Sequence, residues 1–204
     1  RGIRAVADWY MATLLYKDYV MDIFQRQLEI GLQNLELLYQ AVGDKLSAIM
    51  ISAADFGAQH GAFISPVAYR EMFKPCHKAM NDWVHEHTKW KTFYHSCGSM
   101  VDLYDDFVDA GVDIVNPVQI SAEGMDPAYL KERWGDELVF WGGGVDTQHV
   151  LPFGTPDQVE EQVKQNIEIF GQGGGFVFAA VHNIQAGIPT DNLIALFRAV
   201  EQYR

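Results

Sequence analysis

Cysteine and positive charge are both scarce in this sequence. Only two cysteines occur, Cys76 and Cys97, which excludes the disulfide framework of a small secreted domain. The 15 Lys and Arg residues are outnumbered by 27 Asp and Glu residues, giving a formal net charge of −12. Binding to phosphate groups needs clustered Lys and Arg, so this balance argues against a nucleic-acid or anionic-membrane surface. We expect both cysteines to be reduced thiols and the partner to be a small molecule or another protein.

Long apolar runs and several common catalytic motifs are also missing. No segment approaches the roughly 18 to 20 apolar residues that a membrane span needs, and the first residues lack the charged and apolar regions of a signal peptide. We therefore expect a cytoplasmic protein. The sequence has no phosphate-binding loop, no G-x-S-x-G elbow, no H-E-x-x-H pair and no G-x-G-x-x-G fingerprint after a strand. Serine hydrolysis and dinucleotide binding are therefore not indicated.

Apolar, strand-like runs alternate with helix-like segments along the chain. The runs cover residues 45–54, 91–94, 112–115, 138–141 and 176–181. Helices are expected over 5–43, 65–87 with a kink near Lys74 before Pro75, 99–110, a short stretch from 126, 155–170 and 191–203. This alternation and the nearly all-apolar runs predict an α/β protein with a parallel sheet covered by helices.

The number of strand–helix units suggests which α/β architecture is present. An eight-stranded (β/α)8 barrel (TIM barrel) needs about 250 residues, so five βα units in 204 residues are expected to form its C-terminal portion. A doubly wound open sheet is the alternative. We expect a single domain over residues 1–204 that is part of a longer chain, since the sequence starts at Arg1 rather than Met.

The segment 91–99, KTFYHSCGS, has the most informative strand ending. His95 and Cys97 are two residues apart, so they share one face of an extended strand, and a bend at Gly98 would turn both toward one ion. Imidazole and thiolate together suit Zn²⁺, at roughly 2.0 and 2.3 Å. His182, after the last expected strand, is the best candidate for a third ligand, with Asp55 or Asp146 behind it.

The other strand ends supply carboxyl and amide groups. We expect Asp55, Asp146 and His182 to be the catalytic groups that handle protons. The amides expected to bind a polar, uncharged substrate are Asn116, Gln119, Gln148, Asn183 and Gln185. A polar residue after a strand often only caps a helix, and this explanation stays open at each position. The remaining histidines are expected at the surface or an interface: His60, His77, His85, His87 and His149.

Six segments between Ser47 and Ala199 resemble, in order, the uroporphyrinogen decarboxylase superfamily. They are ISPVAYREMFKP, YHSCGSM, GVDIVNPVQ, MDPAYLKERWGD, FWGGGVDTQHVLPFGTP and FVFAAVHNIQAGIP. The resemblance implies a (β/α)8 barrel and a longer chain, of which the N-terminal third is expected to be missing from this sequence. It also implies one of two activities. The superfamily contains uroporphyrinogen decarboxylases and cobalamin-dependent methyltransferases, which take a methyl group from a corrinoid protein.

Two features favour the methyltransferase branch. Its thiol-dependent members hold zinc with a His-x-Cys pair and a later cysteine. His95 and Cys97 match the pair, and His182 stands near the place of the later cysteine. None of the five strand ends carries a Lys or Arg, whereas binding a polycarboxylate such as uroporphyrinogen requires cations.

The expected activity is therefore a zinc-assisted methyl transfer from methylcobalamin on a partner corrinoid protein to a thiol or pterin acceptor. One alternative is cofactor-free decarboxylation of uroporphyrinogen III, in which Asp55 or His182 would move protons. A second alternative is a non-catalytic barrel that docks a corrinoid protein. The sequence leaves open whether the chain forms a homodimer.

Overall fold

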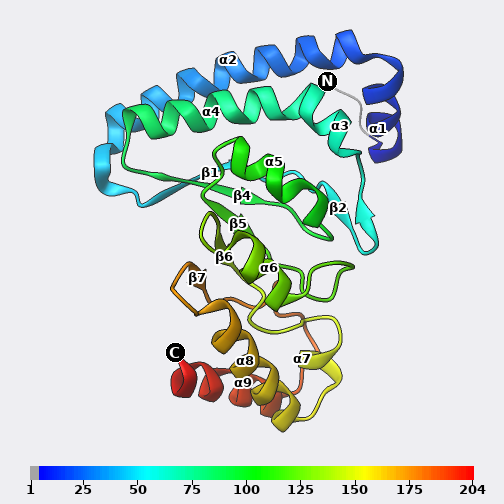
Figure 1. Cartoon of the computed structure of the whole chain (residues 1–204), viewed down its shortest axis with the longest axis vertical. Coiled ribbons are helices and arrows are strands. Elements are labelled where there is room, and N and C mark those ends of the chain that lie inside the picture. The colour runs from blue at the N-terminus through cyan, green and yellow to red at the C-terminus, as the bar shows by residue number, and fades with distance from the viewer. Residues whose placement is uncertain (1–4) are drawn as a thin grey trace.

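The computed structural model describes residues 5–204 and is built on one five-stranded parallel sheet (Figure 1). The strands, in their spatial order, are β1 (Ala48–Ser52), β4 (Lys91–His95), β5 (Ile114–Asn116), β6 (Val139–Trp141) and β7 (Phe176–Val177). All neighbouring strands are parallel. Spatial order follows chain order, as it does for successive βα units around a barrel. The prediction of five parallel βα units is confirmed.

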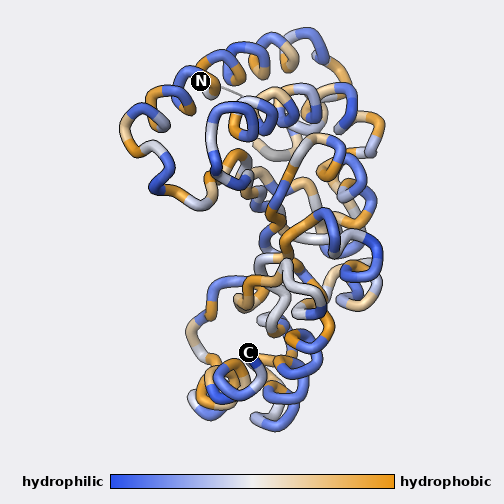
Figure 2. The backbone as a smooth tube through the Cα atoms, turned by 60° about the vertical axis from the view of Figure 1, so that its left-hand side comes forward, coloured by the Kyte–Doolittle hydropathy of each residue, from blue (hydrophilic) through white to orange (hydrophobic). Residues whose placement is uncertain are grey.

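Helices connect and cover these strands. They are α1 (Val6–Leu15), α2 (Lys17–Val42), α3 (Pro66–Ala68), α4 (Lys74–His87), α5 (Tyr104–Asp109), α6 (Pro127–Trp134), α7 (Val150–Phe153), α8 (Pro156–Phe170) and α9 (Thr190–Tyr203). Helices α2 and α4 lie side by side at one end of the molecule, and α8 and α9 lie at the other (Figure 1). The backbone has an open, curved outline rather than that of a closed ring (Figure 2). The fold is therefore an open portion of a (β/α)8 barrel. Across residues 5–204, every helix is too short or too polar to cross a membrane.

Local sequence explains where several helices begin. Ser65, Asp126 and Thr155 each precede a proline and accept a backbone N–H bond from the first turn of the following helix. Proline suits the first helical position because its missing N–H would have no helical partner there. Thr155 also forms a reciprocal capping box with Gln158, as their spacing predicts.

The helix expected over 65–87 is interrupted just before Pro75. A π-helical turn, η2 (Tyr69–Phe73), separates α3 from α4. Proline cannot donate an N–H, and its ring clashes with the carbonyl four residues earlier, so the regular hydrogen-bond ladder cannot continue there. The predicted irregularity near Lys74 is confirmed.

Between the expected strand over 45–54 and the expected helix from residue 65, the chain forms a short antiparallel hairpin of β2 (Gly57–Ala58) and β3 (Gly61–Ala62). The Ser99 N–H donates to the carbonyl oxygen of Ala58 at 2.8 Å. Because this bond holds Ser99 against the hairpin, the helix expected from residue 99 begins only with a 3₁₀ turn at Val101 and continues as α5.

The last strand is shorter than expected. Strand β7 ends at Val177, although bonds from Gly144 N–H to Ala179 O and from Val181 N–H to Val145 O continue the pairing beyond it. Gly142 and Gly143 have φ values of 120° and 79°, which are incompatible with regular strand geometry. These glycines therefore end β6, and regular strand pairing between β6 and β7 ends with them.

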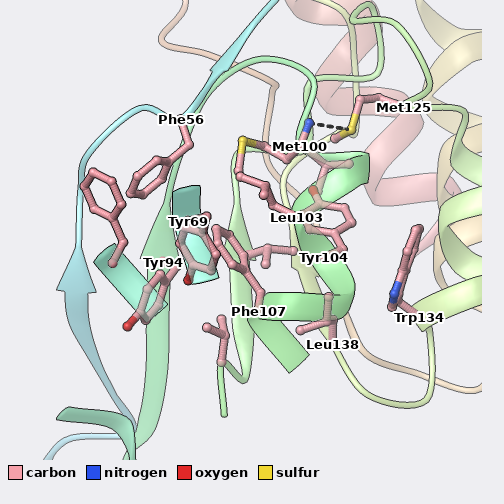
Figure 3. Close-up of a cluster of buried hydrophobic side chains, with 14 of the residues drawn as sticks. Phe56, Tyr69, Tyr94, Met100, Leu103, Tyr104, Phe107, Met125, Trp134 and Leu138 are labelled. Atoms are coloured by element: carbon pink, nitrogen blue, oxygen red, sulfur yellow. Dashed lines mark hydrogen bonds between the residues drawn. The ribbon is translucent and has the colours of Figure 1, made fainter. Parts of the chain in front are cut away.

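An aromatic core fixes the sheet against the helices. Tyr69, Tyr94, Tyr104 and Phe107 are fully buried between β4, η2 and α5 (Figure 3). A second cluster packs between α7, α8 and α9, and its buried members are Val145, Leu151, Val159, Val163, Ala195, Leu196 and Ala199. The two clusters fix the strands and helices between which the site loops run.

Candidate functional site

Three potential metal ligands meet at the carboxyl ends of β1 and β4. One donor atom each from Asp55, His95 and Cys97 lies within 4.8 Å of the others. The His95 Nε2 and Cys97 Sγ atoms are 3.5 Å apart. The structure therefore brings together the predicted His-x-Cys pair and a carboxylate that was expected only as a proton carrier or a reserve ligand.

The backbone fixes Asp55 relative to Cys97. Asp55 Oδ1 accepts the Cys97 N–H at 2.9 Å, which leaves its other carboxylate oxygen free of this bond. On the other side, the Tyr10 hydroxyl of α1 donates to the Asp55 carbonyl at 3.0 Å. The sequence gives no sign of this role for Tyr10, because nothing near Tyr10 in the sequence marks a contact with a residue 45 positions away.

Electrostatics disfavour a thiolate at Cys97 in the absence of a cation. Burial of the thiol, together with the charge and hydrogen bond of Asp55, raises the pKa of Cys97 to about 12. A divalent cation reverses this effect, because thiolate and carboxylate both become its ligands.

The geometry of the pair fits zinc. Tetrahedral coordination, with Zn–N near 2.0 Å and Zn–S near 2.3 Å, places the two donor atoms about 3.5 Å apart. The observed separation of Nε2 and Sγ is 3.5 Å. Nitrogen, sulfur and carboxylate oxygen are also the donor types that zinc takes in proteins. The residues present therefore fit a zinc ion.

The three ligand candidates line one pocket of about 610 Å³. The segment 179–184, which includes His182 and Asn183, lines the same pocket. His182 is exposed in this pocket but lies outside the group of three close donors. Among the described residues that line the pocket, none is Lys or Arg.

Asn116 and Pro117 complete the wall between β4 and β6. Asn116 Oδ1 lies 2.7 Å from His95 Nδ1, and Asn116 Nδ2 donates to the Trp141 carbonyl at 2.8 Å. Both polar ends of this amide are therefore engaged by the protein.

Three other expected site residues bond to the protein away from this wall. Asp146 is buried, caps the Gln148 N–H at 2.8 Å and pairs with His149 at 3.0 Å. Gln119 is also buried. The described residues that line the pocket do not include Asp146, Gln119 or Gln148.

Gln119 supports the ligand loop rather than facing the pocket. Its Oε1 accepts the Gly98 N–H at 2.8 Å, and its Nε2 donates to Gln59 Oε1 at 3.0 Å. Gln185 is exposed beyond the pocket wall, and its amide donates to the Asn183 carbonyl at 3.3 Å. Of the five amides expected to bind substrate, the structure brings Asn116 and Asn183 to the pocket.

One histidine expected at the surface or an interface is instead half-buried among aromatic rings. The His77 ring lies edge-on to Phe56 and Tyr94, and its Nδ1 is 2.9 Å from the Tyr69 hydroxyl. Burial lowers the pKa of His77 to about 4, so this imidazole is neutral at physiological pH. The expectation was wrong because His77 lies on the face of α4 that packs toward the sheet.

The β2–β3 hairpin is a further element of the site, and it was not predicted from the sequence. Gly57 and Gly98 pack backbone to backbone, so closely that a side-chain carbon on Gly98 would lie 2.3 Å from the Gly57 carbonyl carbon. Gly98 also has φ +88°. Two glycines beside the ligand residues are the sequence signal for this contact, and they allow the hairpin to press against the Cys97 turn.

Comparison with curated protein sequences identifies two relatives of this chain. Two curated proteins named uroporphyrinogen decarboxylase, from Pseudoalteromonas translucida and Pseudoalteromonas atlantica, are each 22% identical to this chain over 212 residues. Each alignment covers 97% of the chain and 57% of the relative. The chain thus spans little more than half the length of these relatives.

A solved structure has the same fold. A methyltransferase from Methanosarcina mazei superposes with a TM-score of 0.71 at 18% identity, covering 98% of this chain and 54% of that protein. This structural likeness shows only the fold. The family follows from the sequence, because the family model described as uroporphyrinogen decarboxylase (URO-D) matches residues 7–203. With nearly its whole length matched, the chain belongs to the uroporphyrinogen decarboxylase family.

Proposed function

We propose that this chain belongs to a zinc-dependent methyltransferase that moves a methyl group from a methylcorrinoid protein to a thiol acceptor. The observation that carries the proposal is the cluster of Asp55, His95 and Cys97, whose donor atoms lie within 4.8 Å of one another at the ends of two parallel strands. The carboxylate and thiolate together balance the charge of one Zn²⁺ ion. His182, which lines the same pocket, is the fourth candidate ligand.

The bound metal would supply Lewis-acid chemistry that lowers the pKa of an acceptor thiol. In the transfer, the acceptor loses its proton, its sulfur bonds to the methyl carbon, and the carbon–cobalt bond breaks with both electrons remaining on cobalt. His182 lines the pocket and is the side chain proposed to take the released proton. With a pterin acceptor, the ring nitrogen that gains the methyl group would also lose a proton, which His182 would take.

The pocket favours an uncharged acceptor. Asn183 offers a neutral amide, and Ala179, Ala180 and Ile184 provide apolar wall. No cation from the described residues faces it, so a polycarboxylate would enter without the charged partners that its desolvation requires. The same property argues against uroporphyrinogen decarboxylation as the reaction of this pocket.

Metal analysis tests the proposal directly. We expect one zinc per chain in protein purified without chelator, and loss of that zinc in Cys97→Ala, His95→Ala and Asp55→Asn. Cys76→Ala is the matched control, because Cys76 is the other partly buried thiol and lies in α4. A wild-type protein that takes up no zinc, or a Cys97→Ala variant that binds it unchanged, would contradict the proposal.

Activity assays separate the reaction from its alternatives. We expect transfer of a methyl group from methylcobalamin to a small thiol, and no release of carbon dioxide from uroporphyrinogen III. Metal-independent decarboxylation would establish the activity named for the two curated relatives instead. Tight binding of a corrinoid protein without turnover would favour a docking role.

A further inference from the structure

Asn116 sits between two strands of the site and contacts both. It is the last residue of β5, directly opposite His95 of β4 in the strand register. Its side-chain amide spans from the His95 ring, at 2.7 Å, to the carbonyl of Trp141 on β6, at 2.8 Å. The amide is therefore held at both ends.

The Trp141 contact decides which way the amide points. A backbone carbonyl oxygen can only accept a hydrogen bond, so the amide nitrogen of Asn116 must face Trp141. The amide oxygen must then face Nδ1 of His95, and since this oxygen can only accept, Nδ1 must carry the proton. In the neutral ring, the lone pair then lies on Nε2, the atom 3.5 Å from Cys97 Sγ.

We propose that Asn116 is a positioning residue that holds His95 as the Nδ1–H tautomer and presents Nε2 to a cation beside Cys97. The metal part of this inference rests on the proposed function, whereas the tautomer does not. Partners of this kind, which bind the distal nitrogen of a ligand histidine, fix ring orientation and raise metal affinity. The role differs from the substrate contact that the sequence suggested for Asn116.

The tautomer is measurable in the metal-free protein. Nitrogen-15 NMR of the imidazoles, recorded above about pH 8 where histidine is ordinarily neutral, reports which ring nitrogen is protonated. Comparison with His95→Gln identifies the His95 signals. We expect Nδ1–H in the wild type and a shift toward Nε2–H in Asn116→Leu. A wild-type His95 protonated on Nε2 would overturn the proposal whether or not zinc binds.

Zinc affinity, measured by competition with a chromophoric chelator, tests the consequence. Asn116→Leu is expected to weaken binding by about 10- to 100-fold. Asn116→Asp keeps an oxygen that accepts the Nδ1–H bond and should bind within about 10-fold of the wild type, so it also guards against a folding defect in the leucine variant. Asn34→Leu is the control and should leave zinc affinity unchanged, because Asn34 is an exposed amide of α2 that does not line the pocket.

The outcomes distinguish this inference from the proposed function. If Asn116→Leu binds zinc as tightly as the wild type, Asn116 does not position the ligand. If the wild type binds no zinc, the proposed function fails, while the NMR result still decides the tautomer. A purely structural role for Asn116 would lower the melting temperature of both variants and leave zinc affinity and tautomer unchanged.

Discussion

The protonation state of the Cys97 thiol depends on the charge of its neighbours. Burial and the adjacent Asp55 raise the pKa of Cys97 to about 12, whereas a metal ligand must be a thiolate. One carboxylate therefore has two opposite effects: it keeps the metal-free thiol protonated, and it adds negative charge that attracts a cation. Metal uptake at this site must release the thiol proton, which makes it more favourable as the pH rises.

Asp113 provides a second carboxylate whose ionisation matters, here for stability. It lies just before β5 and bonds to Thr92 N–H at 2.8 Å, to His85 Nε2 at 2.7 Å and to Lys91 Nζ at 2.9 Å. Burial raises the pKa of Asp113, but these three partners together outweigh burial and hold it below its ordinary value. Its charged form is thus favoured in the folded state.

This lowered pKa has a definite sign in the stability of the protein. A carboxyl group whose pKa is lower in the folded state stabilises the fold above its unfolded pKa of about 3.9, and that contribution is lost as the pH falls through the folded pKa. We expect Asp113→Asn to lower the free energy of unfolding at neutral pH by about 1–3 kcal/mol and to flatten the acid dependence below about pH 4. Urea denaturation across pH measures both quantities.

The matched control for Asp113 is Asp136→Asn, since Asp136 is an exposed carboxylate in the loop after α6. It should change the free energy of unfolding by less than about 0.5 kcal/mol. Equal effects of the two variants would show that the contacts of Asp113 contribute no net stability.

At the scale of elements, the hairpin and the ligand turn depend on one backbone contact. Gly98→Ala would place a methyl group 2.3 Å from the Gly57 carbonyl carbon in addition to straining a φ of +88°. We expect it to lower the free energy of unfolding by more than about 2 kcal/mol, because two backbone segments would have to separate. It should also displace Cys97 and weaken zinc binding.

Gly174→Ala isolates the strain from the collision. Gly174 has the same φ of +88°, with nothing within 4 Å of the added carbon. We expect a cost of only about 1–2 kcal/mol and no change in zinc affinity. If the two alanine variants are equally stable in thermal denaturation, the Gly57–Gly98 contact does not hold the hairpin.

The sequence predicts elements well where their causes are local. Ser65 and Thr155 begin helices through bonds to residues three positions later, and Pro75 interrupts one by its own chemistry. The hairpin β2–β3 could not be predicted in this way, because it depends on Ser99 and Gly98, which are distant in the sequence. The same long-range contact delays the start of α5.

For the whole molecule, parallel topology made the general position of the site predictable. Side chains that follow successive parallel strands must lie at one edge of the sheet, which is why Asp55, His95 and Cys97 meet there. The sequence could not show which polar side chains bond to the protein instead. Asp146 and Gln119 follow strands as Asp55 does, yet backbone partners occupy them.

The separation of the two hydrophobic clusters predicts uneven stability across the molecule. Leu196 of α9 is buried in the cluster shared with α7 and α8, whereas β4 and β5 are fixed by the aromatic core. We expect Leu196→Ala to cost about 2–5 kcal/mol and to speed amide hydrogen exchange in α9 and the first turns of α8 much more than in β4. Ile194→Ala, which truncates an exposed residue of the same helix, should have a far smaller effect. Equal acceleration in β4 and α9 would mean that the chain unfolds as a single cooperative unit, so that the pocket wall at 179–184 could not open independently of the ligands on β4.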